Sequence, residues 1–152
     1  MVELQIGALP AHVRTARLIA AAVARRCGVD DAVIDEVKLA VGEACSRAVS
    51  LHAEHAPTEP VVLELRESGN EFEVAVVDIG PADDLREMSA DDAAALVESS
   101  LRMAGDGSDP AQEPLPSHLG LALIAGLVDR MSVDREGDRT AVRMRWLLAA
   151  DA

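Results

Sequence analysis

The sequence predicts a single α+β domain: a two-layer sandwich of a mixed, mostly antiparallel sheet with helices on one face. Its strand-like segments occur in groups rather than in strict alternation with helices, which is typical of α+β folds. A chain of 152 residues with 49% hydrophobic content suits one domain with one core. We therefore expect residues 1–152 to form one domain, with 82–117 as a lid-like insertion within it.

One short strand and two helices are expected in the first part of the chain. Residues 2–6 alternate weakly between apolar and polar side chains and predict a strand, possible at a sheet edge. Pro10 opens a helix that stops near Gly28, because proline is tolerated at a helix start and glycine is favoured just past its end. The chain is organised around the next stretch, 35–55, which predicts a helix that gives way to a polar, proline-bearing link at 52–60. Its core-facing stripe follows helical spacing: Ile34, Val37, Val41, Ala44, Ala48 and Leu51.

Two β-hairpins are expected in the rest of the chain. The strands are predicted at residues 61–66, 72–77, 131–135 and 140–148. Ser68-Gly69-Asn70 supplies turn chemistry for the first hairpin, and a helix over 119–130 precedes the second. In the last strand, Val142, Met144 and Trp146 should point inward and Arg143 and Arg145 to solvent.

The segment 82–117 differs in composition from the rest of the chain. It is rich in acidic residues, Ala, Gly and Pro, and allows one helix at 91–103. Its tail, GDGSDPAQEPLP, is not expected to pack as regular structure and should be mobile. Long insertions in compact domains often serve as lids or binding loops. A lid and a simple insertion are the two alternatives.

Composition excludes several classes of function. The formal net charge of −13 argues against nucleic acid as a partner, because phosphate backbones require a basic face. The longest apolar runs are too short to span a membrane, and the N-terminus lacks the pattern of a secretion signal, so we expect a cytoplasmic protein. Cys27 and Cys45 are isolated, without metal-ligand spacing, and are expected to be reduced packing residues.

Three motifs in order resemble those of the GHKL (histidine-kinase-like) ATPase superfamily. They are Glu43-x-x-x-Arg47, Asp78-Ile79-Gly80 and Leu119-Gly120-Leu121-Ala122-Leu123-Ile124. The short chain, with its N-terminal strand and helix, looks like the bacterial anti-sigma-factor serine kinases of partner-switching systems. The similarity covers roughly Leu4 to Leu148 and implies the histidine-kinase-like ATPase fold with a site for ATP or ADP.

The resemblance implies an adenine site around Asp78. The family's Asp accepts a hydrogen bond from the adenine amino group, and its glycine, here Gly80, lets the base approach the backbone. Ala82 stands where the second glycine of this box would be. Thr140 matches the position of a hydroxyl near the adenine. Read without the family, Asp78 is a turn former and Thr140 a good strand residue.

A phosphate site is implied at the start of the 119–130 helix, where backbone N–H groups meet anions. Gly120 and Leu121 match the family's second glycine box, but Pro116 and His118 replace glycines. Pro116 has no N–H to donate, and His118 carries a side chain where the backbone should approach. His118 could offer its imidazole to a phosphate, or simply face water at the helix start.

Arg47 is the largest departure from the family pattern. In the family's Glu-x-x-x-Asn motif, the Glu takes a proton from the attacking group and the Asn carbonyl holds Mg²⁺. Glu43 matches the catalytic base, but a guanidinium has five donors and no acceptor, so Arg47 cannot ligate a cation. Arg47 could pair with Glu43 one helical turn away or bind a phosphate directly. Binding of Mg²⁺ is therefore doubtful, while ATP or ADP binding is still possible.

Three functions compete. The leading one is an anti-sigma-factor-like regulator that binds a sigma factor, an anti-sigma antagonist or both, with weakened or lost ATP binding. One alternative is an active ATP-dependent serine/threonine kinase that phosphorylates the antagonist, with Glu43 as the base. The other is an acidic interaction domain unrelated to nucleotide-binding proteins. The family pairs through its N-terminal strand and helix, so we expect a homodimer. Arg14 and Arg17, on the outer side of the first helix, belong either to a solvated face or to a partner-docking face.

Overall fold

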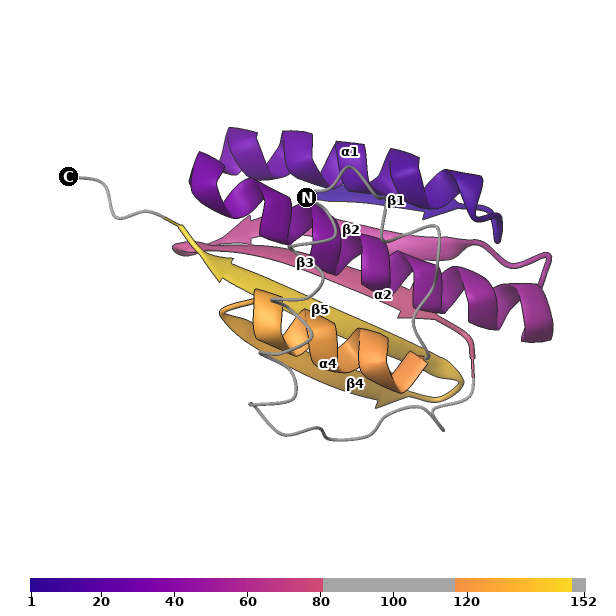
Figure 1. Cartoon of the computed structure of the whole chain (residues 1–152). Helices are drawn as coiled ribbons and strands as arrows, with labels where there is room; N and C mark the ends of the chain where they lie inside the picture. Colours follow the sequence, from indigo (N-terminus) through magenta and orange to yellow (C-terminus); the bar gives the residue numbers. More distant parts are fainter. Residues whose placement is uncertain (81–116, 149–152) are drawn as a thin grey trace.

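The computed structural model describes residues 1–80 and 117–148, and it forms a sheet with helices on one face (Figure 1). The five strands follow the order β1-β2-β3-β5-β4, and every neighbouring pair is antiparallel. Helix α2 lies between α1 and α4 and contacts both. The expected α+β sandwich is confirmed, and its described part contains no parallel strand pair. The expected lid-like insertion lies outside the described residues, except for Ser117, which begins α4.

The elements begin and end close to the positions expected from sequence. Their bounds are β1 Val2–Ile6, α1 Ala11–Cys27, a 3₁₀ turn Asp31–Val33, α2 Ile34–His55, β2 Val61–Ser68, β3 Glu71–Asp78, α4 Ser117–Leu127, β4 Arg130–Glu136 and β5 Arg139–Leu147. Gly28 ends α1 with φ of +94°, a left-handed conformation that glycine adopts without strain. The Asp30 carboxylate accepts the Ala32 N–H at 2.9 Å and so caps the 3₁₀ turn that leads into α2.

The two hairpins place one apolar face of the sheet against the helices. β2 and β3 are joined at Gly69, and β4 and β5 at Gly137, both with positive φ. Inward-facing side chains of β2, β3 and β5 alternate with outward ones, as period-two patterning requires. The buried, inward-facing apolar residues of these strands are Val61, Leu63, Leu65, Phe72, Val74, Val76, Val142, Met144 and Trp146.

Phe72 and Trp146 are cross-strand partners at the centre of this apolar layer. Their ring centroids lie 6.0 Å apart with an interplanar angle of 29°. The indole Nε1 of Trp146 donates to the carbonyl of Leu127 at 3.1 Å, which fastens the end of α4 to β5. In an otherwise aliphatic core, this aromatic pair supplies the largest buried side chains. Its one polar atom, the indole nitrogen, has a hydrogen-bond partner in the Leu127 carbonyl.

Helix α2 is buried far beyond the stripe that its sequence pattern suggests. Ile34, Val37 and Val41 are buried as expected, but so are charged and polar residues on its other sides, Glu43, Arg47 and His52. The cause is its central position, with α1 on one side, α4 on the other and β3 beneath. A helix enclosed in this way buries polar side chains, and each of these then needs a partner.

Candidate functional site

Arg47 and Asp78 form a buried ion pair between α2 and β3. The Arg47 Nη1 lies 2.7 Å from Asp78 Oδ2, and the two side chains are 2% and 0% exposed. The other carboxylate oxygen, Oδ1, accepts the Gly80 N–H at 2.8 Å. Both oxygens of Asp78 therefore have donors from within the protein. A carboxylate this deeply buried requires such partners, because burial of an unpaired charge is strongly unfavourable.

Alternation along β3 directs Asp78 toward α2. Val74 and Val76 face the helices, and Asp78 continues the same inner face at the end of the strand. Arg47 approaches it from the helix layer. The sequence-based alternatives for Arg47 were a phosphate or Glu43, and the structure adds Asp78, which neither alternative included.

Gly80 occupies a position where a side chain would not fit. A Cβ placed on its backbone would lie 2.8 Å from both Cβ and Cδ1 of Leu51 on α2. Glycine is therefore required here by the close approach of the chain to α2. The same approach places its N–H against Asp78.

Thr140 and Arg135 extend this polar cluster across the sheet. Thr140 is the register partner of Asp78 on one side and of Arg135 on the other. The Arg135 Nη1 donates to Thr140 Oγ1 at 2.9 Å and to the Gly80 carbonyl at 3.2 Å. Two arginines thus hold the ends of β3 and β5, one from the helix layer and one from β4.

Glu43 forms a second centre, one helical turn before Arg47. Glu43 is only 5% exposed. Its Oε2 lies close to Gly120 at the start of α4: a Cβ added to Gly120 would be 3.4 Å from this oxygen. Burial raises the pKa of Glu43 to about 7, and the nearby Arg17 guanidinium acts in the opposite direction. A carboxyl with this pKa can exchange a proton near neutral pH.

Arg17 is not on a solvated face. Its aliphatic stem lies across Gly42, where a Cβ would come within 2.8 Å of Arg17 Cδ, and its charge acts on Glu43. The residue is half-buried, whereas Arg14 is exposed. The expectation of a solvated outer face is therefore wrong for Arg17, whereas exposed Arg14 fits either a solvated or a partner-docking face. A small residue at position 42 is what lets the arginine of α1 reach the acid of α2.

His52 connects α2 to both ends of the β2–β3 hairpin. Its Nε2 accepts the Ile79 N–H at 2.9 Å, so Nδ1 carries the proton and donates to the Glu59 carbonyl at 2.8 Å. The fully buried ring fixes the chain beside Asp78 and Gly80. Sequence reasoning placed His52 in a polar link and missed this role.

Comparison with known proteins identifies the fold family. The model of the histidine kinase-like ATPase domain matches residues 6–146. The chain belongs to this family. It is also similar to the serine-protein kinase RsbW of Halalkalibacterium halodurans, with 30% identity over 146 residues, which covers 96% of this chain and 83% of that protein. The superfamily and the serine-kinase branch expected from the three motifs are thus confirmed.

Histidine kinase-like ATPase domains bind ATP, and this chain brings most of the expected site residues into two adjoining groups along α2. Asp78, Gly80, Thr140 and Arg47 form one group, and Glu43 with Gly120 the other. Leu121 is buried in the first turns of α4. The His118 backbone is helical, but its side chain lies outside the described part of the structure, so its expected roles stay predictions.

Arg135 is a member of the site that sequence reasoning missed. Alternation along β4 contained the signal, because Met131 and Val133 precede Arg135 at two-residue steps on the inner face. The contacts of Arg135 with Thr140 and Gly80 show that it closes the β4 side of the cluster.

Proposed function

We propose that this chain is an anti-sigma-factor-like regulator of a partner-switching system, with weakened or lost ATP binding. It would bind a sigma factor, an anti-sigma antagonist or both. Membership in the histidine kinase-like ATPase family and similarity to a serine-protein kinase support the regulatory class. The proposal that ATP binding is weakened or lost rests on the buried Arg47–Asp78 ion pair.

The ion pair opposes adenine binding at the carboxylate that the family uses. An adenine amino group needs an acceptor, and both oxygens of Asp78 already accept from Arg47 and Gly80. A purine that took over Oδ2 would have to displace the Arg47 guanidinium from this buried carboxylate oxygen. Breaking a buried pair typically costs about 3–5 kcal/mol, which weakens an affinity by a factor of about 150 to 4,000.

Arg47 also disfavours a divalent cation at the family's metal position. Mg²⁺ requires oxygen ligands, and a guanidinium has none to offer. Phosphoryl transfer depends mainly on positioning and on charge neutralisation by the metal. The residues present therefore do not fit a metal-dependent kinase site as they stand.

Calorimetric titration with ADP and ATP, with and without Mg²⁺, tests this proposal. We expect no measurable heat for the native protein and Mg²⁺-dependent binding for Arg47→Asn, which supplies the amide and frees Asp78. Arg25→Asn, on the exposed end of α1, is the matched control and should behave like the native protein. Tight Mg²⁺-dependent binding by the native protein would overturn the proposal. Binding that ignores Mg²⁺ would instead assign Arg47 to phosphate recognition.

An active kinase is the second candidate, and the environment of Glu43 favours it. A pKa of about 7 suits a general base that accepts a proton from an attacking hydroxyl or water. This candidate predicts Mg²⁺-dependent release of phosphate from ATP that is abolished in Glu43→Gln. If phosphate release by the native protein does not exceed that of Glu43→Gln, the kinase candidate is eliminated.

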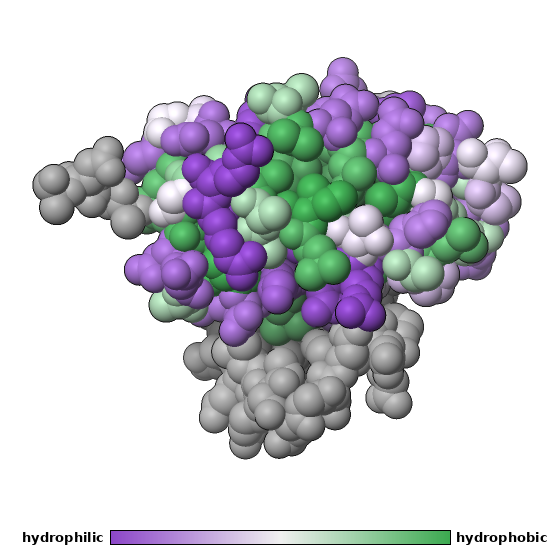
Figure 2. All heavy atoms as spheres, turned by 90° about the horizontal axis from the view of Figure 1, so that it is seen from above, coloured by the Kyte–Doolittle hydropathy of each residue, from purple (hydrophilic) through white to green (hydrophobic). Residues whose placement is uncertain are grey.

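We also propose that the chain forms a homodimer through β1 and α1. Figure 2 shows hydrophobic residues gathered on the side of the molecule that carries these elements. The exposed large apolar side chains there include Val2, Leu9 and Leu18. β1 is an edge strand of the described sheet and presents backbone groups for pairing. Light scattering should give the mass of a dimer, and Leu18→Glu should shift it to a monomer; a native monomer would contradict the proposal.

The proposed location is the cytoplasm, where a regulator of transcription factors would act. In residues 1–80 and 117–148, no helix is both long enough and apolar enough to cross a membrane. Fractionation of cells that express the tagged chain tests the location, and recovery with membranes would contradict it.

A further inference from the structure

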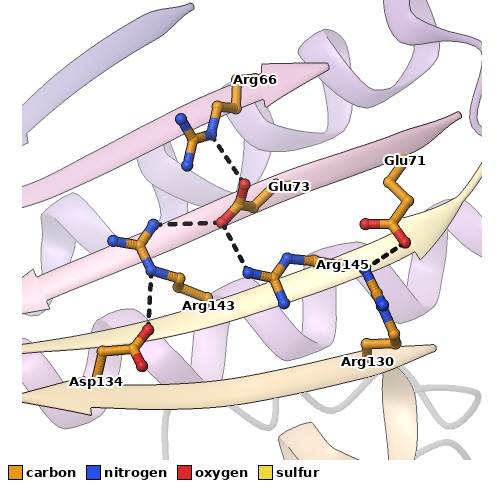
Figure 3. Close-up of polar contacts among 7 residues, drawn as sticks. All are labelled: Arg66, Glu71, Glu73, Arg130, Asp134, Arg143 and Arg145. Atoms are coloured by element: carbon orange, nitrogen blue, oxygen red, sulfur yellow. Dashed lines mark hydrogen bonds and ion pairs between the residues drawn. The ribbon is translucent and has the colours of Figure 1, made fainter. Parts of the chain in front are cut away.

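The sheet face opposite the helices carries a row of charged side chains that crosses four strands (Figure 3). Arg66 on β2, Glu73 on β3, Arg145 on β5 and Arg130 on β4 are successive cross-strand partners. We call these four residues the arginine row. With strands about 4.8 Å apart, the row is about 14 Å long.

Glu73 is the shared partner within this face. Its carboxylate contacts Arg66 Nε at 2.9 Å, Arg143 Nη1 at 3.3 Å and Arg145 Nη2 at 3.7 Å. Burial opposes ionisation of this side chain, which is 7% exposed, yet the hydrogen bonds from Arg66 and Arg143 hold the pKa of Glu73 below its usual range. One carboxylate thus serves three guanidinium groups.

The arginines are only partly satisfied by this arrangement. Arg66 bonds Glu73 through Nε and is 45% exposed, so its terminal nitrogens are available at the surface. Arg145 reaches Glu73 only at 3.7 Å, beyond hydrogen-bond distance, and is 28% exposed. Five N–H donors per guanidinium give these side chains more hydrogen-bonding capacity than the neighbouring carboxylates use.

Arg130 and Arg145 stand directly opposite each other in the β4–β5 pair. Like charges in this position destabilise a sheet. Arg130 is drawn past β5 to Glu71 on β3, 2.7 Å away, which relieves part of the repulsion but leaves Arg145 beside it. A local rule broken on an exposed face, without full compensation, is typical of a functional surface.

We propose that the arginine row is a docking surface for an acidic segment of a protein partner. Within the row, three guanidinium groups stand against one carboxylate, in a chain whose formal net charge is −13. The N–H donors that Glu73 leaves unused are therefore available to the carboxylates of an acidic segment. Guanidinium forks bind carboxylates in well-defined geometry. The overall negative charge disfavours a long phosphate backbone. The surface lies on the opposite side of the sheet from the helix-facing Asp78, so this inference does not depend on the proposed function.

Fluorescence anisotropy with a labelled octaglutamate peptide tests the proposal, with octaglutamine as the uncharged probe. The native protein should bind octaglutamate in low salt, and Arg66→Gln/Arg145→Gln should weaken binding by about tenfold. The matched control, Arg25→Gln/Arg26→Gln at the exposed end of α1, removes the same charge and should change binding by less than about twofold. Equal loss in both double variants, or no binding by the native protein, overturns the proposal.

Glu73→Gln separates docking from a purely structural role. This variant removes the internal competitor for the arginines and should tighten octaglutamate binding, whereas a structural charge ladder predicts no gain. Circular dichroism tests whether each variant is folded. If the double variant is not, Arg66→Gln alone replaces it, because Arg66 is the most exposed of the three arginines that contact Glu73. Stronger binding of a labelled oligothymidine than of octaglutamate would identify a nucleic-acid surface and overturn the assignment. So would self-association that Arg66→Gln abolishes, since the occupant would then be a second copy of the chain.

Discussion

Asp78 and Thr140 lie directly opposite each other on β3 and β5, and both are fully buried. Each is held by an arginine from a different element: Arg47 of α2 binds Asp78, and Arg135 of β4 binds Thr140. The family resemblance assigns both residues to adenine recognition. In this chain the same two side chains accept hydrogen bonds from two arginines of the protein itself.

A double-mutant cycle should show that Arg47 and Asp78 are strongly coupled. Arg47→Ala leaves the Asp78 carboxylate buried without its cation and should lower the free energy of unfolding by about 3–5 kcal/mol. Asp78→Ala removes the carboxylate that Arg47 binds and should also destabilise the protein. The double variant removes both, and its loss should be clearly smaller than the sum of the single losses. Urea unfolding of the four proteins measures the coupling, and strictly additive losses would contradict a direct pair.

Glu43 should make stability depend on pH around neutrality. Its pKa rises from 4.5 to about 7 on folding, so the folded state binds the proton more tightly than the unfolded state does. The associated stability is present below about pH 4.5 and is lost as the pH rises through about 7. The shift corresponds to about 3 kcal/mol. Urea midpoints measured from about pH 5 to 8 should fall for the native protein and change much less for Glu43→Gln.

The comparison that decides this prediction is made at the alkaline end. Near pH 8, Glu43→Gln should be more stable than the native protein, because the amide carries no charge to bury. Equal pH profiles for the two proteins would show that Glu43 keeps its solution pKa. Other carboxyls, such as Glu73, titrate in both proteins and cancel in the difference.

His52 is expected to be a major stabilising residue although it lies near the end of a helix. His52→Ala removes the bonds to Ile79 and Glu59 and leaves a cavity, and should cost about 3 kcal/mol. His55→Ala, one turn later and exposed, is the matched control and should change stability by less than about 0.5 kcal/mol. Hydrogen exchange should also accelerate at the Ile79 amide in the first variant only. Similar losses in both variants would contradict the proposed tether.

The fold was predictable because its signals are local. Alternation with turn glycines defined both hairpins, and Pro10 and Gly28 marked the ends of α1. The family motifs also placed Asp78 and Thr140 in one site. The partners of the arginines were harder to predict, because Arg47 and Asp78 are 31 residues apart and sequence reasoning considered only a phosphate and the neighbour one helical turn away. Only the packing of α2 on β3 determines which carboxylate the guanidinium meets.

Helix burial explains the remaining differences between sequence and structure. An amphipathic stripe indicates one buried face, but α2 is enclosed by two helices and the sheet, so His52 is buried although its composition suggests a link. Arg17 was assigned to the outer side of the first helix because the apolar residues of that helix take the inward side. Its contact depends on Gly42, whose missing side chain makes room on α2 for the arginine stem. The apolar periodicity of one helix does not indicate which residues of another helix it will contact.

Gly80 should tolerate no side chain, for a steric reason that is separate from nucleotide binding. In Gly80→Ala, the new Cβ would lie 2.8 Å from Leu51 Cβ and Cδ1, and because one of these atoms is next to the helix backbone, rotamer changes cannot relieve the clash. We expect a loss of about 1–3 kcal/mol in urea unfolding. Gly120→Ala is the matched control, since its Cβ would meet Glu43 Oε2 at an ordinary 3.4 Å and alanine favours a helix. This control should be neutral or stabilising. If Gly80→Ala were equally well tolerated, the tight approach of this segment to α2 would be wrong, and with it the geometry that places the Gly80 N–H on Asp78.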